Sequence, residues 1–130
     1  GGGGALHIAT QYNVNKIFVV SPVISFKAVD KIESLENYLR KEHNKNYRFN
    51  SKDWQNLIKD KVWDLRSNTV KENSNVAIIT GKNDDQIKEK DVIEFGERNQ
   101  INVETYDLGH ITLSKIPDPI LLKIFKFFSK

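Results

Sequence analysis

The stretch NVAIITGKNDDQIKEKDVIEFGERNQINVETYDLGH, residues 75–110, decides how this chain is expected to fold. It opens with an apolar run typical of a buried strand, Val76–Thr80, and then turns through two adjacent acids, Asp84 and Asp85. An amphipathic helical pattern follows, and a second strand pattern ends in a turn that carries His110. Because parallel strands of an open α/β sheet gather ligands and chemistry at their carboxyl edge, we expect an acid and a histidine to meet there.

The remaining apolar patterns surround this stretch with further elements. Lys16–Val20 is a continuous apolar run, as expected for a strand buried on both faces. Apolar stripes at helical spacing predict five helices: Ala5–Tyr12, Lys31–Lys41 capped by Asp30, Ser51–Arg66 capped by Ser51, Lys88–Asn99, and a last helix that Asp118 caps and that runs to the end. An alternating pattern predicts a further strand over Ile101–Asp107. Strands separated by helices imply parallel pairing through right-handed crossovers. The expected fold class is therefore α/β, a three-layer αβα domain over residues 1–130 with a mostly parallel sheet of about three strands.

Residues 30–73 lie between two predicted strands and are too long for a simple crossover. We interpret them as a helical, cap-like insertion, because such insertions often cover active sites. The alternative is two ordinary helices that pack on the core, since an amphipathic stripe mostly marks a packing face.

Composition excludes several classes of function. The chain has 130 residues and a net charge of +3, with no basic block that would indicate nucleic-acid binding. It has no cysteine, and therefore no disulfide or thiolate nucleophile, and it shows no secretory signal or apolar run of membrane-spanning length. A cytoplasmic protein without a membrane segment is expected.

The four glycines Gly1–Gly4 permit two interpretations. They could be a flexible leader, or they could be the end of a nucleophile elbow, G-x-S-x-G, in which small residues let a helix start close to the preceding strand. Four glycines in a helix start would cost several kcal/mol at about 1 kcal/mol each. We therefore expect the first helix to begin after them.

Several motifs in this order resemble the C-terminal half of an α/β-hydrolase-fold serine hydrolase of the esterase, lipase and peptidase group. GGGGALHIA is similar to the end of the elbow and its helix, and KIFVVSPVI resembles the sixth strand of that fold. AIITGKNDDQI resembles the strand and G-x-x-D-x-x-[IV] turn of the family, and YDLGH resembles its strand and Gly-His turn. The resemblance covers the whole chain and implies a partial α/β-hydrolase domain.

On this resemblance, His110 is the catalytic base and Asp84 the acid that orients it, with Asp85 as the second choice. The implied reaction is hydrolysis of a carboxylic ester or amide, without a cofactor or a metal ion. The family's serine would precede Gly1, and no serine of this chain stands in a G-x-S-x-G context. We therefore expect the chain to be inactive alone. Outside the family, Asp84 would be a turn-capping aspartate and His110 an ordinary loop histidine.

The sequence also raises the question of what lies beside the first strand. If Lys16–Val20 is an edge strand, its unpaired backbone groups need a neighbour. We expect a missing N-terminal half, a second copy or another subunit there. The alternative function is a non-catalytic α/β domain that binds a protein partner through this open edge. A nucleotide-binding module is disfavoured, because no glycine-rich phosphate motif occurs.

Overall fold

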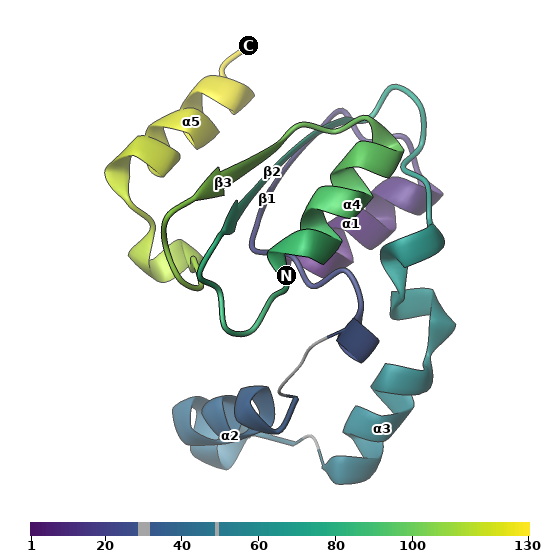
Figure 1. The fold of residues 1–130 in the computed structure, drawn as a ribbon, viewed down its shortest axis with the longest axis vertical. Helices are drawn as coiled ribbons and strands as arrows, with labels where there is room; N and C mark the ends of the chain where they lie inside the picture. Colours follow the sequence, from purple (N-terminus) through teal and green to yellow (C-terminus); the bar gives the residue numbers. More distant parts are fainter. Residues whose placement is uncertain (29–31, 49) are drawn as a thin grey trace.

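The computed structural model describes residues 1–28, 32–48 and 50–130 and places a sheet between two layers of helices (Figure 1). The helices and strands follow one another as α1 (Gly2–Gln11), β1 (Lys16–Val20), α2 (Ile32–His43), α3 (Ser51–Lys59), β2 (Asn75–Gly81), α4 (Glu89–Asn99), β3 (Val103–Tyr106) and α5 (Asp118–Phe128). Short 3₁₀ turns connect them at η1 (Phe26–Ala28), η2 (Asn44–Asn46), η3 (Lys61–Trp63), η4 (Leu65–Ser67) and η5 (Leu113–Lys115).

The sheet has the strand order β1-β2-β3, and both pairings are parallel. Val19 pairs with Ile78 across the first ladder, and Ile78 pairs with Val103 across the second. Helices α1 and α4 lie on one side of the sheet and α5 on the other (Figure 1). The predicted α/β class and its three layers are confirmed.

Successive side chains of the central strand enter two different cores, as the two-residue period of a strand requires. Ile78 joins the larger core under α1 and α4, together with Leu6 and Phe95. Ile79 joins the smaller core under α5, together with Ile120. This alternation explains why the strand reads as a continuous apolar run instead of an alternating one.

Helix α1 begins at Gly2, so the prediction that the helix starts after the glycines is wrong. A helical glycine does cost about 1 kcal/mol relative to alanine, but two of these glycines lie where a side chain has no room. A Cβ on Gly2 would lie 2.7 Å from Cγ1 of Val19, and a Cβ on Gly3 would lie 2.6 Å from the carbonyl oxygen of Val23. Close packing on β1 and its exit therefore outweighs helix propensity here.

The helix predicted from Ser51 to Arg66 does begin at Ser51, but its predicted cap and its predicted end are wrong. Asn50 is the N-cap instead of Ser51, because its side chain accepts from Asp53 N while the Asp53 carboxylate accepts from Asn50 N. The helix stops at Lys59, since Asp60 adopts an extended backbone and its carboxylate caps the separate turn η3.

The boundaries of the remaining helices and strands lie closer to the predicted ones. Helix α2 follows the predicted one closely, but its predicted cap, Asp30, lies outside the described residues. Strand β3 is shorter than the predicted Ile101–Asp107. The predicted cap of the last helix is wrong, because Asp118 lies inside α5 and Pro117 occupies the N-cap position.

Helix α5 buries only part of its apolar stripe. Ile120 is buried, whereas Phe125 is 64% exposed and Leu122 and Phe128 are also exposed. Lys123 pairs with Glu104 of β3 at the solvent-exposed margin of this contact, whereas Ile120 packs in the smaller core. The pairing with the Lys123 ammonium, and a hydrogen bond from the Tyr106 hydroxyl, hold the pKa of Glu104 below its usual range although partial burial opposes this.

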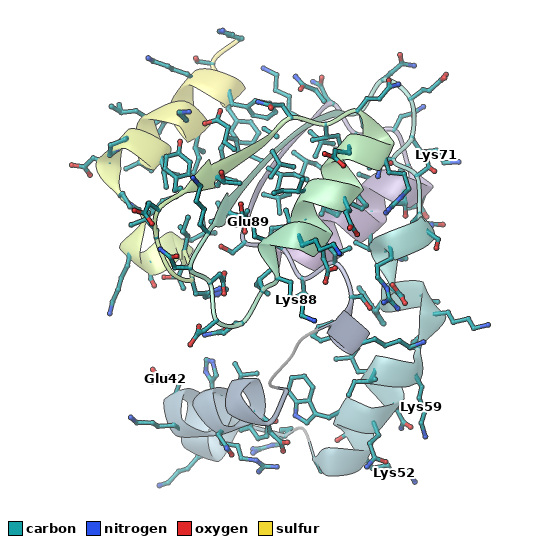
Figure 2. The ribbon with its side chains drawn as sticks, in the orientation of Figure 1. Glu42, Lys52, Lys59, Lys71, Lys88 and Glu89 are labelled. Atoms are coloured by element: carbon teal, nitrogen blue, oxygen red, sulfur yellow. The ribbon has the colours of Figure 1, made fainter. Side chains whose placement is uncertain are left out.

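Helices α2 and α3 lie beyond the carboxyl ends of the strands (Figure 1). Lys52 and Lys59 point away from the body of the protein on the outer side of α3 (Figure 2). The apolar residues of α3 therefore face inward. Among the described residues, none of the helices has the length and apolar character needed to span a membrane.

Candidate active site

The turn after β2 and the turn after β3 are joined by their backbones. Lys82 N donates to the carbonyl of Tyr106 at 2.8 Å, and Asn83 N donates to the carbonyl of Leu108 at 3.0 Å. The Asn83 side chain adds a hydrogen bond to Asp107 at 2.7 Å. These bonds fix the turn that carries the acids against the turn that carries the histidine.

Gly81 makes this close approach possible. A Cβ at this position would lie 2.2 Å from the carbonyl oxygen of Gly109 and 2.5 Å from that of Leu108. Gly109 is less restricted, because a Cβ added there would have the Asn83 carbonyl oxygen, at 3.8 Å, as its nearest neighbour. Packing therefore requires a glycine at position 81, in the turn that carries Asp84, but not at position 109, in the turn that carries His110.

Asp84 and His110 meet at the carboxyl edge of the sheet. His110 Nδ1 lies 2.8 Å from Asp84 Oδ2, and the Asp84 side chain is fully buried while that of His110 is 27% exposed. The other Asp84 oxygen, Oδ1, accepts from the backbone N–H of Gln86 at 2.8 Å and of Ile87 at 2.9 Å. The turn-capping role and the histidine-orienting role expected of Asp84 thus fall on different oxygens of one carboxylate.

The protonation of this pair follows from its surroundings. Burial alone would raise the pKa of Asp84, but the hydrogen bonds from His110, Ile87 and Gln86 outweigh burial and keep the pKa below its usual range. An ionised carboxylate can only accept hydrogen bonds, so His110 Nδ1 carries the proton of the neutral imidazole. Nε2 then holds a lone pair, and within the described part of the chain it has no hydrogen-bond partner.

The second-choice acid, Asp85, is exposed, and the hydrogen bond of His110 Nδ1 is with Asp84. The structure therefore joins His110 to Asp84, as the register of the turn motif predicted. The remaining histidines lie elsewhere: the His7 ring packs against Trp63 with centroids 5.1 Å apart, and His43 is exposed at the end of α2.

His110 forms part of the wall of a cavity of about 430 Å³, which is within the usual range for small-molecule sites. The glycines of α1 form another part of the wall, and the insertion contributes Leu57 and Trp63. Two residues that contribute to the cavity, Ser21 and Trp63, were not among the predicted site residues. Trp63 lies off the apolar stripe of its segment, which was the one sequence signal for it.

Ser21 has an unusual conformation for a strand exit. Its φ is 45°, in the left-handed region that non-glycine residues rarely adopt, and its side chain is buried. Its Oγ accepts a hydrogen bond from the N–H of Ile111 at 3.3 Å, immediately after His110. Ser21 therefore ties the end of β1 to the loop that carries the histidine.

The described residues contain no cluster of three or more histidine, cysteine, aspartate or glutamate side chains that could hold a metal ion. Chemically, the site offers a polarised imidazole beside a cavity, which is suited to general base and general acid catalysis. Compared with known proteins, the chain matches no protein-family description and no curated protein.

Proposed function

We propose that this chain supplies the acid and the histidine of a serine hydrolase triad, and that it acts on a carboxylic ester or amide. The observation that carries the proposal is the hydrogen bond between buried Asp84 and His110 at the wall of a cavity. The resemblance of the surrounding motifs to the C-terminal half of an α/β-hydrolase supports the same assignment. We also propose a cytoplasmic location, which the absence of cysteine permits.

In the proposed reaction, His110 Nε2 accepts the proton of a serine hydroxyl as that oxygen attacks the acyl carbon. Asp84 stabilises the resulting imidazolium and holds its ring in position. His110 then returns the proton to the leaving alcohol or amine, and a water molecule repeats the sequence to release the acid. The cycle thus uses both protonation states of His110, the neutral imidazole as a base and the imidazolium as an acid.

The serine of this reaction lies outside the chain in our proposal. Of the serines present, Ser21 contributes to the cavity wall, but its Oγ accepts the Ile111 N–H and no elbow sequence surrounds it. The position of Gly2 and Gly3 against β1 and its exit supports the interpretation of these glycines as the end of an elbow. A polypeptide segment N-terminal to Gly1 would then carry the serine.

A second candidate is a non-catalytic domain that binds a protein partner along β1. Among the described strands, β1 hydrogen-bonds only to β2, so its other edge is open. An open edge of apolar residues favours pairing with another strand. In the hydrolase proposal the same edge receives the missing half or a second copy.

Labelling with a fluorophosphonate, read by intact mass, tests the hydrolase proposal, because this reagent reacts with a serine that a base activates. Residues 1–130 alone are expected to give no adduct. The same residues expressed with the reading frame that precedes Gly1 are expected to give a single adduct N-terminal to Gly1. The adduct should disappear in the His110→Ala variant.

Matched variants make the result specific. Glu97→Ala removes an exposed side chain of α4 that contributes nothing to the cavity wall, and it should leave labelling unchanged. An adduct on any serine of residues 1–130 would overturn the proposal, as would an extended protein that is never labelled. The second result would favour the partner-binding domain.

A further inference from the structure

A second cavity, of about 400 Å³, lies among η1, α2 and α3. Its wall is mainly apolar and includes Phe26, Leu39, Tyr47, Trp54 and Leu57. The Trp54 indole N–H donates to the Tyr47 hydroxyl at 2.6 Å, so the two polar groups satisfy one another. The wall therefore offers contact surface for an apolar group.

The two cavities adjoin. Phe26 and Leu57 contribute to the wall of the second cavity and also to that of the cavity beside His110. Phe26 packs its ring edge-on against Trp54, with centroids 6.3 Å apart. The pair Phe26 and Leu57 thus separates the histidine from the apolar space between α2 and α3.

The polar groups of the second cavity lie at its solvent side. His43, Asn46 and Arg48 contribute to its wall and are exposed. A ligand that enters from His110 would therefore meet apolar surface first and charged, hydrated groups last. This order suits a chain of methylene groups, since burial of each contributes favourable free energy without a demand for hydrogen bonds.

We propose that the two cavities form one substrate site, in which the ester or amide group lies at His110 and a long aliphatic acyl chain passes between Phe26 and Leu57 into the second cavity. This inference rests on the proposed function and names its substrate class, long-chain aliphatic esters or amides. It also gives residues 30–73 a defined role, which is to hold the acyl chain.

The two tryptophans of the chain allow a direct test, because Trp63 contributes to the first cavity and Trp54 to the second. In the ¹H–¹⁵N spectrum of residues 1–130, each indole N–H gives its own signal. Butanoate, a short product mimic, is expected to shift the Trp63 signal only. Monomeric dodecanoate is expected to shift both signals along one binding curve, and to bind at least about tenfold more tightly.

A variant at the shared wall makes the test sharper. Leu57→Phe adds bulk between the cavities and should weaken dodecanoate binding by about tenfold or more. Butanoate binding should weaken far less, because butanoate does not need to pass between the cavities. Gln55→Phe places the same side chain on an exposed position of α3 and serves as the matched control. Competition with butanoate should displace dodecanoate, because both carboxylates would lie at His110.

The outcomes separate this inference from the proposed function. If dodecanoate shifts Trp63 alone, Trp54 alone or neither, the continuous site is refuted, whatever fluorophosphonate labelling shows. If both signals shift together while the extended protein is never labelled, the chain-binding site stands and the hydrolase proposal fails.

Discussion

Gly81→Ala should damage both the stability and the candidate site of this protein. The new Cβ would lie 2.2 Å from the Gly109 carbonyl oxygen, although real contacts of this kind do not fall below 3.0 Å. The obstacle is backbone and not the end of a flexible side chain, so the turn before His110 must retreat by roughly 0.8 Å or the strand end must move. Overpacking of this kind costs about 1–3 kcal/mol of the free energy of unfolding.

The same movement reaches the hydrogen bond of the site. His110 Nδ1 and Asp84 Oδ2 are 2.8 Å apart, and a displacement of roughly 0.8 Å away from the Asp84 turn would lengthen their contact beyond hydrogen-bond distance. In a chain of this length, the stability cost corresponds to a fall in melting temperature of roughly 4–12 °C. Both effects should therefore appear together.

Thermal denaturation gives the first effect, and long-range ¹H–¹⁵N spectra of the imidazole give the second, because they report which ring nitrogen carries the proton. Gly109→Ala is the matched control, since a Cβ at Gly109 meets no atom closer than 3.8 Å. It should melt close to the unsubstituted protein and keep the proton on Nδ1. Equal melting temperatures for Gly81→Ala and Gly109→Ala would contradict the packing argument.

Substitutions at four further positions test the site and the start of the first helix. Asp84→Asn should lower the free energy of unfolding by about 1 kcal/mol at neutral pH. Because the pKa of Asp84 is lowered in the folded state, this difference should persist above a pH of about 4 and shrink as the pH falls through the folded pKa. Urea titrations at several pH values will measure it. Ser21→Ala leaves a buried N–H beside His110 without its acceptor and should cost about 1–3 kcal/mol in urea denaturation, whereas Ser21→Gly should be the more stable of the two because φ is positive there. Gly4→Ala should stabilise the protein by up to about 1 kcal/mol, since Gly4 lies in α1 with open space around it. Gly3→Ala should destabilise the protein. Equal melting temperatures of both variants and the parent chain would indicate that the glycines form a flexible leader.

The parts of the fold that the sequence predicts correctly are those in which local pattern and tertiary burial agree. Lys16–Val20 is apolar after its first residue and is a strand with the predicted bounds, because it lies between two helical layers. The meeting of Asp84 with His110 follows from topology alone, since parallel strands end at one edge. Asp84 lies in the turn after β2 and His110 in the turn after β3, and both strands can be read from their sequence patterns.

The parts that the sequence does not predict depend on atoms that are distant along the chain. Nothing in the spacing of GGGG shows that Gly2 and Gly3 will touch β1 and its exit, so helix propensity gives the wrong start for α1. Asn50 and Ser51 are both good caps, and the choice between them is made by the reciprocal bond with Asp53. Cavities have no sequence signature of their own, which is why Ser21 escaped prediction.

The two candidate functions make different demands on Asp84. A partner-binding domain needs this residue only to hold its turn, and one oxygen, Oδ1, already accepts both backbone N–H groups. Asparagine could keep those two bonds, so partner binding through β1 should survive Asp84→Asn. A triad acid must also keep the proton of His110 on Nδ1, and the amide of asparagine would instead favour the opposite tautomer, with the proton on Nε2. Loss of fluorophosphonate labelling with a retained fold in Asp84→Asn would therefore identify the second oxygen, Oδ2, as the one that serves catalysis.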